Sequence, residues 1–171
     1  MRKMVEILDA KTQEQIRQVS ILMRAFVDWH RQRHIEDHHL IDEYFDTKGF
    51  EEELASLPGK YAPPKGRLLL ASIDNQPAGC AALRQIDESA CEMKRMFVYP
   101  KFQGKGVGRA LSEKLIQEAR MIGYASMLLD TSFRQIEAQG LYKSLGFKRI
   151  EPYYELPEKL ENWLVFMELI L

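Results

Sequence analysis

Residues 103–109 have the composition of a loop that binds an anion. Three glycines at alternating positions leave consecutive backbone N–H groups unobstructed by Cβ atoms. The stretch that follows has apolar residues at helical spacing, so the loop leads into a helix whose first N–H groups lack partners and lie at its positive end. This arrangement predicts a site for a phosphate or pyrophosphate. Its residues are Gln103, Gly104, Lys105, Gly106, Val107, Gly108 and Arg109.

Two other phosphate loops do not match this segment. A dinucleotide-binding fingerprint requires glycine at the position of Arg109. A Walker A loop requires Ser or Thr directly after its Gly-Lys pair, but Lys105 is followed by Gly106. The segment therefore fits neither of the common nucleotide-binding patterns.

The loop and a second segment together resemble the GNAT superfamily of N-acetyltransferases. The pattern Gln103-Gly104-x-Gly106-x-Gly108 follows a strand that ends near Val98, and it is similar to the acetyl-CoA loop of that superfamily. The segment Ala138-x-x-Leu141-Tyr142-x-x-x-Gly146-Phe147 is similar to the superfamily's next helix and its exit turn. The resemblance covers about residues 67–150 well and the N-terminal third only in general layout. It implies an acetyl-CoA-dependent N-acetyltransferase that acts on a primary amine of a small molecule or a protein.

The resemblance also implies how acetyl-CoA is held. The loop N–H groups would bind the pyrophosphate with help from Lys105 and Arg109, although a solvated surface suits the Lys105 side chain equally well. The end of the preceding strand would pair with the pantetheine arm, and the Val98 N–H would face the thioester oxygen. The strand residues are Met96, Phe97 and Val98. Thr131 or Ser132 would take over part of a contact that asparagine makes in relatives, because no asparagine follows the strand before them.

Tyr142 and Glu92 are the candidate catalytic residues. By the resemblance, Tyr142 stands where a tyrosine protonates the departing sulfur. The alternative interpretation is that Tyr142 packs on the core face of a short helix and has no catalytic role. Glu92 lies six residues before Val98, where some relatives carry a glutamate that takes the proton of the amine. A solvated or ion-paired glutamate is an equally good interpretation. Strand alternation places Cys91 on the opposite face from Glu92, which argues against an acetyl-cysteine, so we expect direct transfer in a ternary complex.

The acceptor pocket is expected from three stretches: residues 34–50, Glu92 and the turn 152–154. They supply carboxylates and aromatic rings, which together suit a cationic amine with some apolar surface. The alternative is that the acids face solvent and the rings fill the core. The side chains concerned are Glu36, Asp37, Asp42, Glu43, Glu92, Tyr44, Phe45, Tyr153 and Tyr154.

These sites require an α+β fold, which we expect to be one domain over residues 1–171. Short turns join three strands into an antiparallel meander, and the strand after the glycine-loop helix completes a βαβ unit. The resemblance implies a GNAT-like mixed, mostly antiparallel sheet of six or seven strands with flanking helices. The predicted strands are Met4–Leu8, Arg67–Ile73, Ala78–Ile86, Cys91–Tyr99, Ala125–Asp130, Phe147–Ile150 and Trp163–Leu171.

Helical spacing predicts four further segments. Thr12 with Gln15 has the spacing of a capping box, so a first helix begins there and runs to about Trp29. Residues 30–39 are dense in His, Arg and acid, and we expect a solvated loop in preference to a metal site. Residues 40–57 predict two short helices or one broken helix. The remaining helices are Val107–Ile122, which stops at Gly123, and Ile136–Leu145, which is closed by Gly146.

Composition narrows the class of protein further. A formal net charge of −1 gives no general attraction to nucleic acid, and no apolar segment has the length that spans a bilayer. We therefore expect a cytoplasmic protein without nucleic-acid or membrane partners and without a metal, and the sequence allows a homodimer. The two cysteines, Cys80 and Cys91, are expected to be small buried side chains. The rival functions are an inactive acyl-CoA-binding sensor, against which Tyr142 argues, and a nucleic-acid-associated protein, against which the net charge argues.

Overall fold

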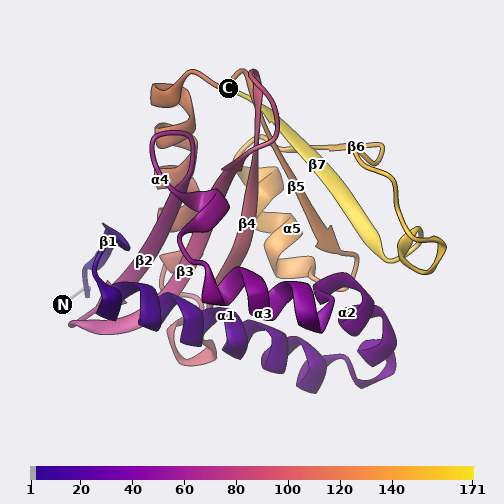
Figure 1. Cartoon of the computed structure of the whole chain (residues 1–171), viewed down its shortest axis with the longest axis horizontal. Helices are drawn as coiled ribbons and strands as arrows, with labels where there is room; N and C mark the ends of the chain where they lie inside the picture. Colours follow the sequence, from indigo (N-terminus) through magenta and orange to yellow (C-terminus); the bar gives the residue numbers. More distant parts are fainter. Residues whose placement is uncertain (1–2) are drawn as a thin grey trace.

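The computed structural model describes residues 3–171, which form one seven-stranded sheet of the order β1-β2-β3-β4-β5-β7-β6 (Figure 1). All neighbouring strands are antiparallel except β4 and β5, which are parallel, as the predicted βαβ unit requires. The mixed, mostly antiparallel α+β sheet is therefore confirmed. The strands are β1 Val5–Asp9, β2 Arg67–Ile73, β3 Gln76–Gln85, β4 Ala90–Val98, β5 Ser126–Ser132, β6 Lys148–Ile150 and β7 Leu164–Ile170.

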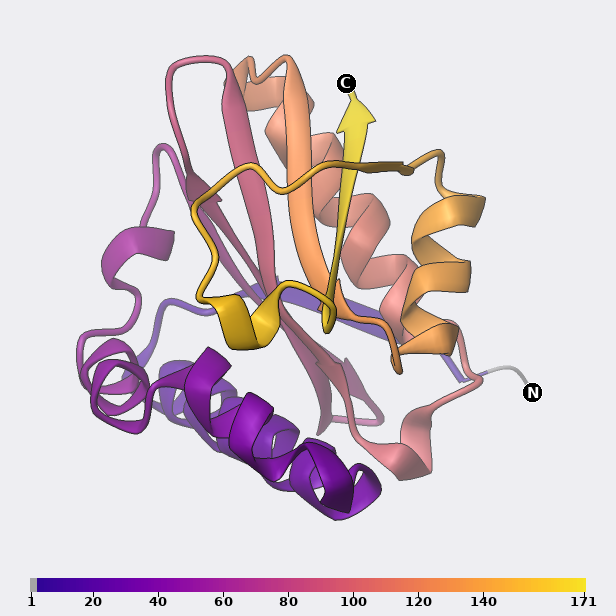
Figure 2. The same ribbon diagram turned by 90° about the vertical axis from the view of Figure 1, so that its right-hand side faces the viewer.

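The helices cover both faces of the sheet (Figure 2) and create two apolar cores. One core lies between the sheet and α4 and α5, and the other lies between the opposite face and α1, α2 and α3. Among residues 3–171, none of the helices combines the length and apolar character needed to cross a membrane. The bounds are α1 Gln13–Arg33, α2 His38–Phe45, α3 Thr47–Ala55, α4 Val107–Ile122 and α5 Ile136–Ser144.

The pairing of β4 with β5 ends early, and this opens the sheet. The two strands are paired only from Ala90↔Ser126 to Glu92↔Leu128. Beyond that point β4 contains a bulge, in which two residues lie opposite Ala81 of β3 and Arg95 has a φ of 57°. A bulge bends its strand, so β4 turns away while β5 continues beside β7.

The N-terminal third follows the predicted elements with one correction. The capping box at Thr12 and Gln15 is present, but α1 continues to Arg33, four residues past the expected end. Residues 30–39 are not a solvated loop: they contain the end of α1, the short 3-10 turn Ile35–Asp37 and the start of α2. His30, His34 and Asp37 are buried. The prediction failed because the aromatic rings and the arginine that cover these polar residues come from distant segments.

Residues 40–57 form two helices, as one of the two alternatives predicted. The break falls at Asp46, whose φ of 40° interrupts the helix between α2 and α3. Cys80 and Cys91 are buried free thiols, and burial raises the pKa of each to about 12, so both behave as small core side chains. In the described chain no cluster of three or more His, Cys, Asp or Glu could hold a metal ion.

Candidate active site

A groove of about 580 Å³ lies where the glycine loop, the end of β4, the end of α1 and the helix α5 meet. Its walls contain all but two of the residues that were predicted to hold acetyl-CoA. Those present are Met96, Phe97, Val98, Gln103, Gly104, Gly106, Val107, Gly108, Arg109 and Tyr142. The exceptions are Lys105, which lines a separate hollow beside Ile73, and Thr131, which lines a smaller cavity described below.

The glycine loop has the backbone of an anion cradle. Gly104 and Gly106 have φ values of 76° and 83°, and a Cβ atom built on either would meet nothing within 4 Å. Both therefore face open space in a conformation that favours glycine. Gly106 is the N-cap of α4 and supplies no side-chain cap, so the first-turn N–H groups of the helix remain available to an anion.

The polar side chains around the loop have different partners. The Arg109 guanidinium donates to the Ser144 Oγ at 2.6 Å and stays at the groove wall. The Gln103 Nε2 donates to the Val98 carbonyl at 3.2 Å, so this side chain ties the loop to the end of β4. The Lys105 Nζ lies 5.6 Å from the centre of the Phe102 ring, outside the groove lining.

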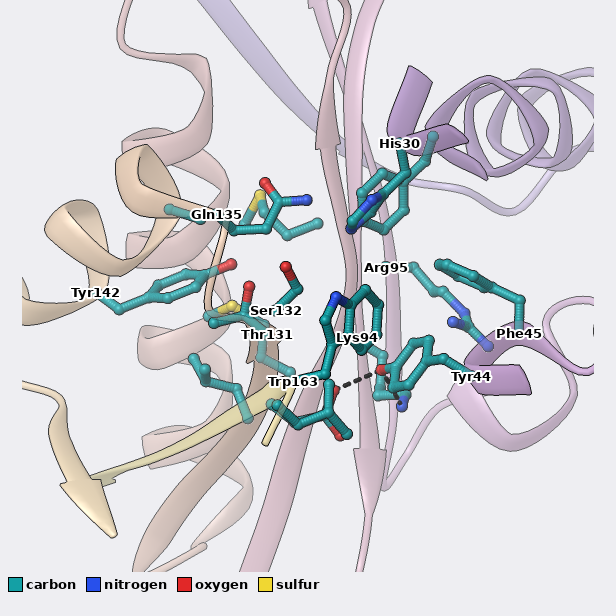
Figure 3. A pocket seen from close by; sticks show the side chains of 17 residues that line it. His30, Tyr44, Phe45, Lys94, Arg95, Thr131, Ser132, Gln135, Tyr142 and Trp163 are labelled. Carbon is teal, nitrogen blue, oxygen red and sulfur yellow. Dashed lines mark hydrogen bonds between the residues drawn. The ribbon is translucent and has the colours of Figure 1, made fainter. Parts of the chain in front are cut away.

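A smaller cavity of about 70 Å³ adjoins the groove, and Tyr142 lines both (Figure 3). The cavity lies at the sheet opening between β4, β5, α1, α2 and α5. Figure 3 shows Lys94, Tyr44 and Trp163 along one part of its wall and Thr131, Ser132, Gln135 and Tyr142 along another. The groove thus leads from the glycine loop to a polar cavity, with the Tyr142 side chain at their junction.

Tyr142 is 5% exposed and projects from α5. Burial, with a contribution from the negative charge of Asp130, raises the pKa of its hydroxyl well above the ordinary value. The hydroxyl therefore remains protonated in neutral solution and can donate its proton to a more basic group.

Glu92 lies beneath the small cavity and lines neither hollow. It is 1% exposed; the Arg84 Nε donates to its Oε1 at 2.7 Å, and the Tyr153 hydroxyl donates to its Oε2. Burial opposes ionisation, but Lys94, Tyr153 and Arg84 outweigh it and lower the pKa of Glu92. The carboxylate is thus an ion-paired group, and Lys94 of the cavity wall has its Nζ 3.9 Å from Oε1.

Three of the other carboxylates expected near the acceptor are held elsewhere, and the fourth, Glu43, is exposed on α2. Asp37 accepts from the Arg134 Nε at 2.5 Å and from the Trp163 Nε1 at 3.1 Å. Glu36 pairs with Arg134 at 3.1 Å, and Asp42 pairs with Arg31. Of the expected acids, the described cavity wall includes none. Of the expected aromatic residues it includes Tyr44 and Phe45.

Lys94, Asp130 and His30 are among the residues of the cavity wall that were not singled out from the sequence. Lys94 and Asp130 are ordinary strand residues by composition, and only their alternation with Glu92 and Leu128 could have placed them on one face. His30 is 3% exposed and its Nδ1 has no hydrogen-bond partner. Burial, together with nearby His34, lowers the pKa of His30 to about 4, so the ring is neutral at physiological pH.

Comparison with known proteins gives a consistent result. A model of the family described as "Acetyltransferase (GNAT) family" matches residues 24–147. An uncharacterised N-acetyltransferase of Schizosaccharomyces pombe is 39% identical over 69% of this chain and 78% of its own length. One from Dictyostelium discoideum is 30% identical over 96% of this chain and 98% of its own length. Human N-acetylaspartate synthetase is 32% identical over 61% of this chain but only 36% of its own length.

Solved structures share the fold. An acetyltransferase from Streptococcus agalactiae superimposes with a TM-score of 0.74 at 23% identity, with 98% of each chain covered. A PaiA N-acetyltransferase from Thermoplasma acidophilum, solved in complex with coenzyme A, gives a TM-score of 0.72 at 16% identity and covers 98% of this chain and 99% of its own. At these identities the likeness concerns the fold alone.

Proposed function

Because this chain belongs to the GNAT acetyltransferase family and is an N-acetyltransferase, we propose that it transfers an acetyl group directly from acetyl-CoA to a primary amine within a ternary complex. The observation that carries the proposal is the continuity between the groove and the small cavity at Tyr142. Such a transfer requires a site for acetyl-CoA, which the glycine loop would supply, and an adjoining site for the amine, which the polar cavity would supply.

The residues of the groove fit acetyl-CoA. The uncapped first turn of α4 and the open face of Gly104 and Gly106 would bind the pyrophosphate, and Arg109 would add a charged contact. Residues 96–98 lie beyond the paired part of β4 and β5, so their backbone is free to pair with the pantetheine arm. Thr131 stands on the wall of the adjoining cavity, where its contact with the arm would be close to the thioester. The Lys105 ammonium, which lies over the Phe102 ring, would contact the pyrophosphate only if its side chain changed rotamer.

The chemical step needs a donor for the oxyanion and a proton for the sulfur. When bound, acetyl-CoA supplies the acetyl thioester. The amine nitrogen forms a bond to the carbonyl carbon, the carbon–sulfur bond breaks, and the products are the amide and coenzyme A with its thiol restored. We assign the Val98 N–H to the carbonyl oxygen and the Tyr142 hydroxyl to the sulfur, to which it would donate a hydrogen bond and then its proton as the carbon–sulfur bond breaks. The raised pKa keeps the hydroxyl protonated until that step, and it also makes Tyr142 a weaker acid than an ordinary tyrosine.

The proton of the amine has to leave as well, and Glu92 remains the proposed acceptor of it. Its lowered pKa keeps the carboxylate ionised, as a base requires. Since Glu92 lies behind Lys94 and does not line the cavity, a proton would reach it through an intervening water. The alternative is that Glu92 holds Lys94 in place and takes no part in proton transfer.

Calorimetry with acetyl-CoA, with ATP and with NAD tests the proposal. We expect the protein to bind acetyl-CoA but neither ATP nor NAD, and to release thiol from acetyl-CoA in the presence of an amine. Binding without turnover on any amine would instead favour the acyl-CoA-binding sensor, and the absence of acetyl-CoA binding would overturn both. The partial similarity to an N-acetylaspartate synthetase is a reason to include amino acids among the acceptors beside polyamines, aminoglycosides and peptides.

A further inference from the structure

We propose that the acceptor is a small amine that carries a carboxylate close to its amino group, of the kind represented by a free amino acid, and that Lys94 and Asp130 recognise its two opposite charges. This inference rests on the proposed acetyl transfer and specifies its substrate class. It starts from the position of these two side chains at the sheet opening, next to Tyr142.

The topology puts Lys94 and Asp130 on the two sides of that opening. The last paired residues of β4 and β5 are Glu92 and Leu128. Each of the two side chains lies two residues beyond its strand's last pair, so alternation directs both to the same face of the sheet. The Lys94 Nζ donates to the Tyr44 hydroxyl at 3.3 Å, and Tyr44 in turn donates to the Asp130 Oδ1 at 2.5 Å. Figure 3 shows Lys94 and Tyr44 side by side at the cavity.

Both side chains keep hydrogen-bonding capacity for a ligand. An ammonium has three donors, and the Lys94 Nζ uses one on Tyr44 while the Glu92 Oε1, at 3.9 Å, is beyond hydrogen-bond distance. A carboxylate can accept about four hydrogen bonds, and Asp130 accepts from Tyr44 and, at 2.8 Å, from Tyr154. The carboxylate of the substrate would take the remaining donors of Lys94. The amino group of the substrate would donate to the remaining positions of Asp130.

The other charges near the cavity are neutralised within the protein. Arg95 is among the residues that line the cavity, but its guanidinium donates to both oxygens of Glu53, at 2.8 and 3.1 Å. Glu92 is paired with Arg84. Of the charged residues on the described cavity wall, Lys94 shares the Glu92 carboxylate with Arg84, and Asp130 accepts hydrogen bonds from tyrosine hydroxyls. A polyamine would bring a second cation toward Lys94, whose side chain is only 15% exposed, whereas a carboxylate would add a charged partner closer than the Glu92 oxygen at 3.9 Å.

The test compares matched acceptors in an assay of thiol release from acetyl-CoA. A set of free amino acids is measured beside their C-terminal amides and their decarboxylated amines, which keep the amino group and remove the carboxylate. We expect kcat/KM to be on the order of 10²-fold higher for the amino acids, the usual value of a charged hydrogen-bonded contact.

Variants locate the contact. Lys94→Met should bring the ratio of amino acid to amide close to one, whereas Lys94→Arg, which keeps the charge, should retain most of the preference. Asp130→Asn should raise KM for the amino acids. Lys148→Met, which removes an exposed lysine on β6, is the matched control and should leave the ratio unchanged. Circular dichroism and the melting temperature confirm that each variant is folded.

Two outcomes would overturn this inference while the acetyltransferase assignment stands. One is equal or faster acetylation of the amides and decarboxylated amines. The other is binding of acetyl-CoA with acetylation of only those amines that lack a carboxylate, or of no amine in the set. A preference for amino acids that survives unchanged in Lys94→Met would show that another group recognises the carboxylate. Failure to bind acetyl-CoA would reject the proposed function itself.

Discussion

Tyr142 is the residue whose position most directly connects structure and reaction, because it lines both hollows and its hydroxyl is held protonated by burial. We expect Tyr142→Phe to lower kcat by roughly 10²-fold, the contribution of one general acid, with little change in the affinity for acetyl-CoA. Steady-state kinetics and calorimetry give the two quantities. A fully active Tyr142→Phe enzyme would mean that solvent protonates the sulfur and that Tyr142 is a core residue packed on Phe147.

Gly106 allows a test of the phosphate site at the same scale. Gly106→Glu should abolish acetyl-CoA binding, because the side chain would put a negative charge where the pyrophosphate is expected. The positive φ adds a strain of about 1 kcal/mol for any residue other than glycine. Gly106→Ala carries the same strain without the charge and should bind acetyl-CoA more weakly by about tenfold at most. If calorimetry gave both variants the affinity of the native protein for acetyl-CoA, the phosphate site would have to lie elsewhere.

At the scale of elements, the bulge in β4 anchors α3 and α2, and α2 lines the small cavity. Its residue Arg95 pairs with Glu53 of α3 and lies 5.2 and 5.3 Å from the ring centres of Phe45 and Phe50. Burial opposes the charge of Glu53, but Arg95 and Lys60 lower the pKa of Glu53 to about 2. One buried ion pair thus fixes α2 and α3 against the sheet opening.

Removing one partner of that pair should loosen both helices. Arg95→Met leaves the buried Glu53 carboxylate with Lys60 alone, and we expect a loss of about 3 kcal/mol in the free energy of unfolding. Hydrogen exchange should accelerate in α2 and α3 and remain unchanged in α4. The double variant with Glu53→Gln should recover part of the loss, since the unpaired charge is then absent. Uniform acceleration over the whole chain would argue against a local anchor.

At the scale of the whole molecule, the buried histidines make stability sensitive to acid. The pKa of His30 falls from 6.5 to about 4 on folding, because burial and nearby His34 disfavour its charged form. Between these pH values the unfolded chain binds a proton that the folded protein does not bind. The stabilisation is therefore complete above pH 6.5 and is lost progressively as the pH falls toward 4, by roughly 3 kcal/mol in total. Burial lowers the pKa of His34 as well, so its contribution has the same sign.

Chemical denaturation across this pH range measures the effect. The free energy of unfolding should decrease with acid in the native sequence and decrease less in His30→Phe, which keeps an aromatic ring among Phe26, Trp29 and Trp163. His39→Gln, at an exposed position of α2, should leave the slope unchanged. An identical slope in the native protein and in His30→Phe would show that other groups determine the acid sensitivity.

The sequence by itself determined the family, the order of the elements and most of the residues that line the groove beside the glycine loop. The reason is that these signals are local: the glycines of residues 103–109 need no distant partner to specify a loop and a helix start, and Gly123 and Gly146 mark helix ends through their own backbone freedom. The pairing of two local motifs was enough to predict an acetyltransferase, and the family match confirms that prediction.

Only the tertiary structure decided what faces the acceptor. Lys94 and Asp130 are 36 positions apart in sequence and both line the opening that forms where β4 and β5 separate after one short parallel segment. Asp37 is withdrawn from the cavity by Arg134, a contact across 97 positions, and Glu92 by Arg84, Lys94 and Tyr153. The charge of a pocket depends on which acids are already paired, and that depends on long-range packing that composition and periodicity do not encode.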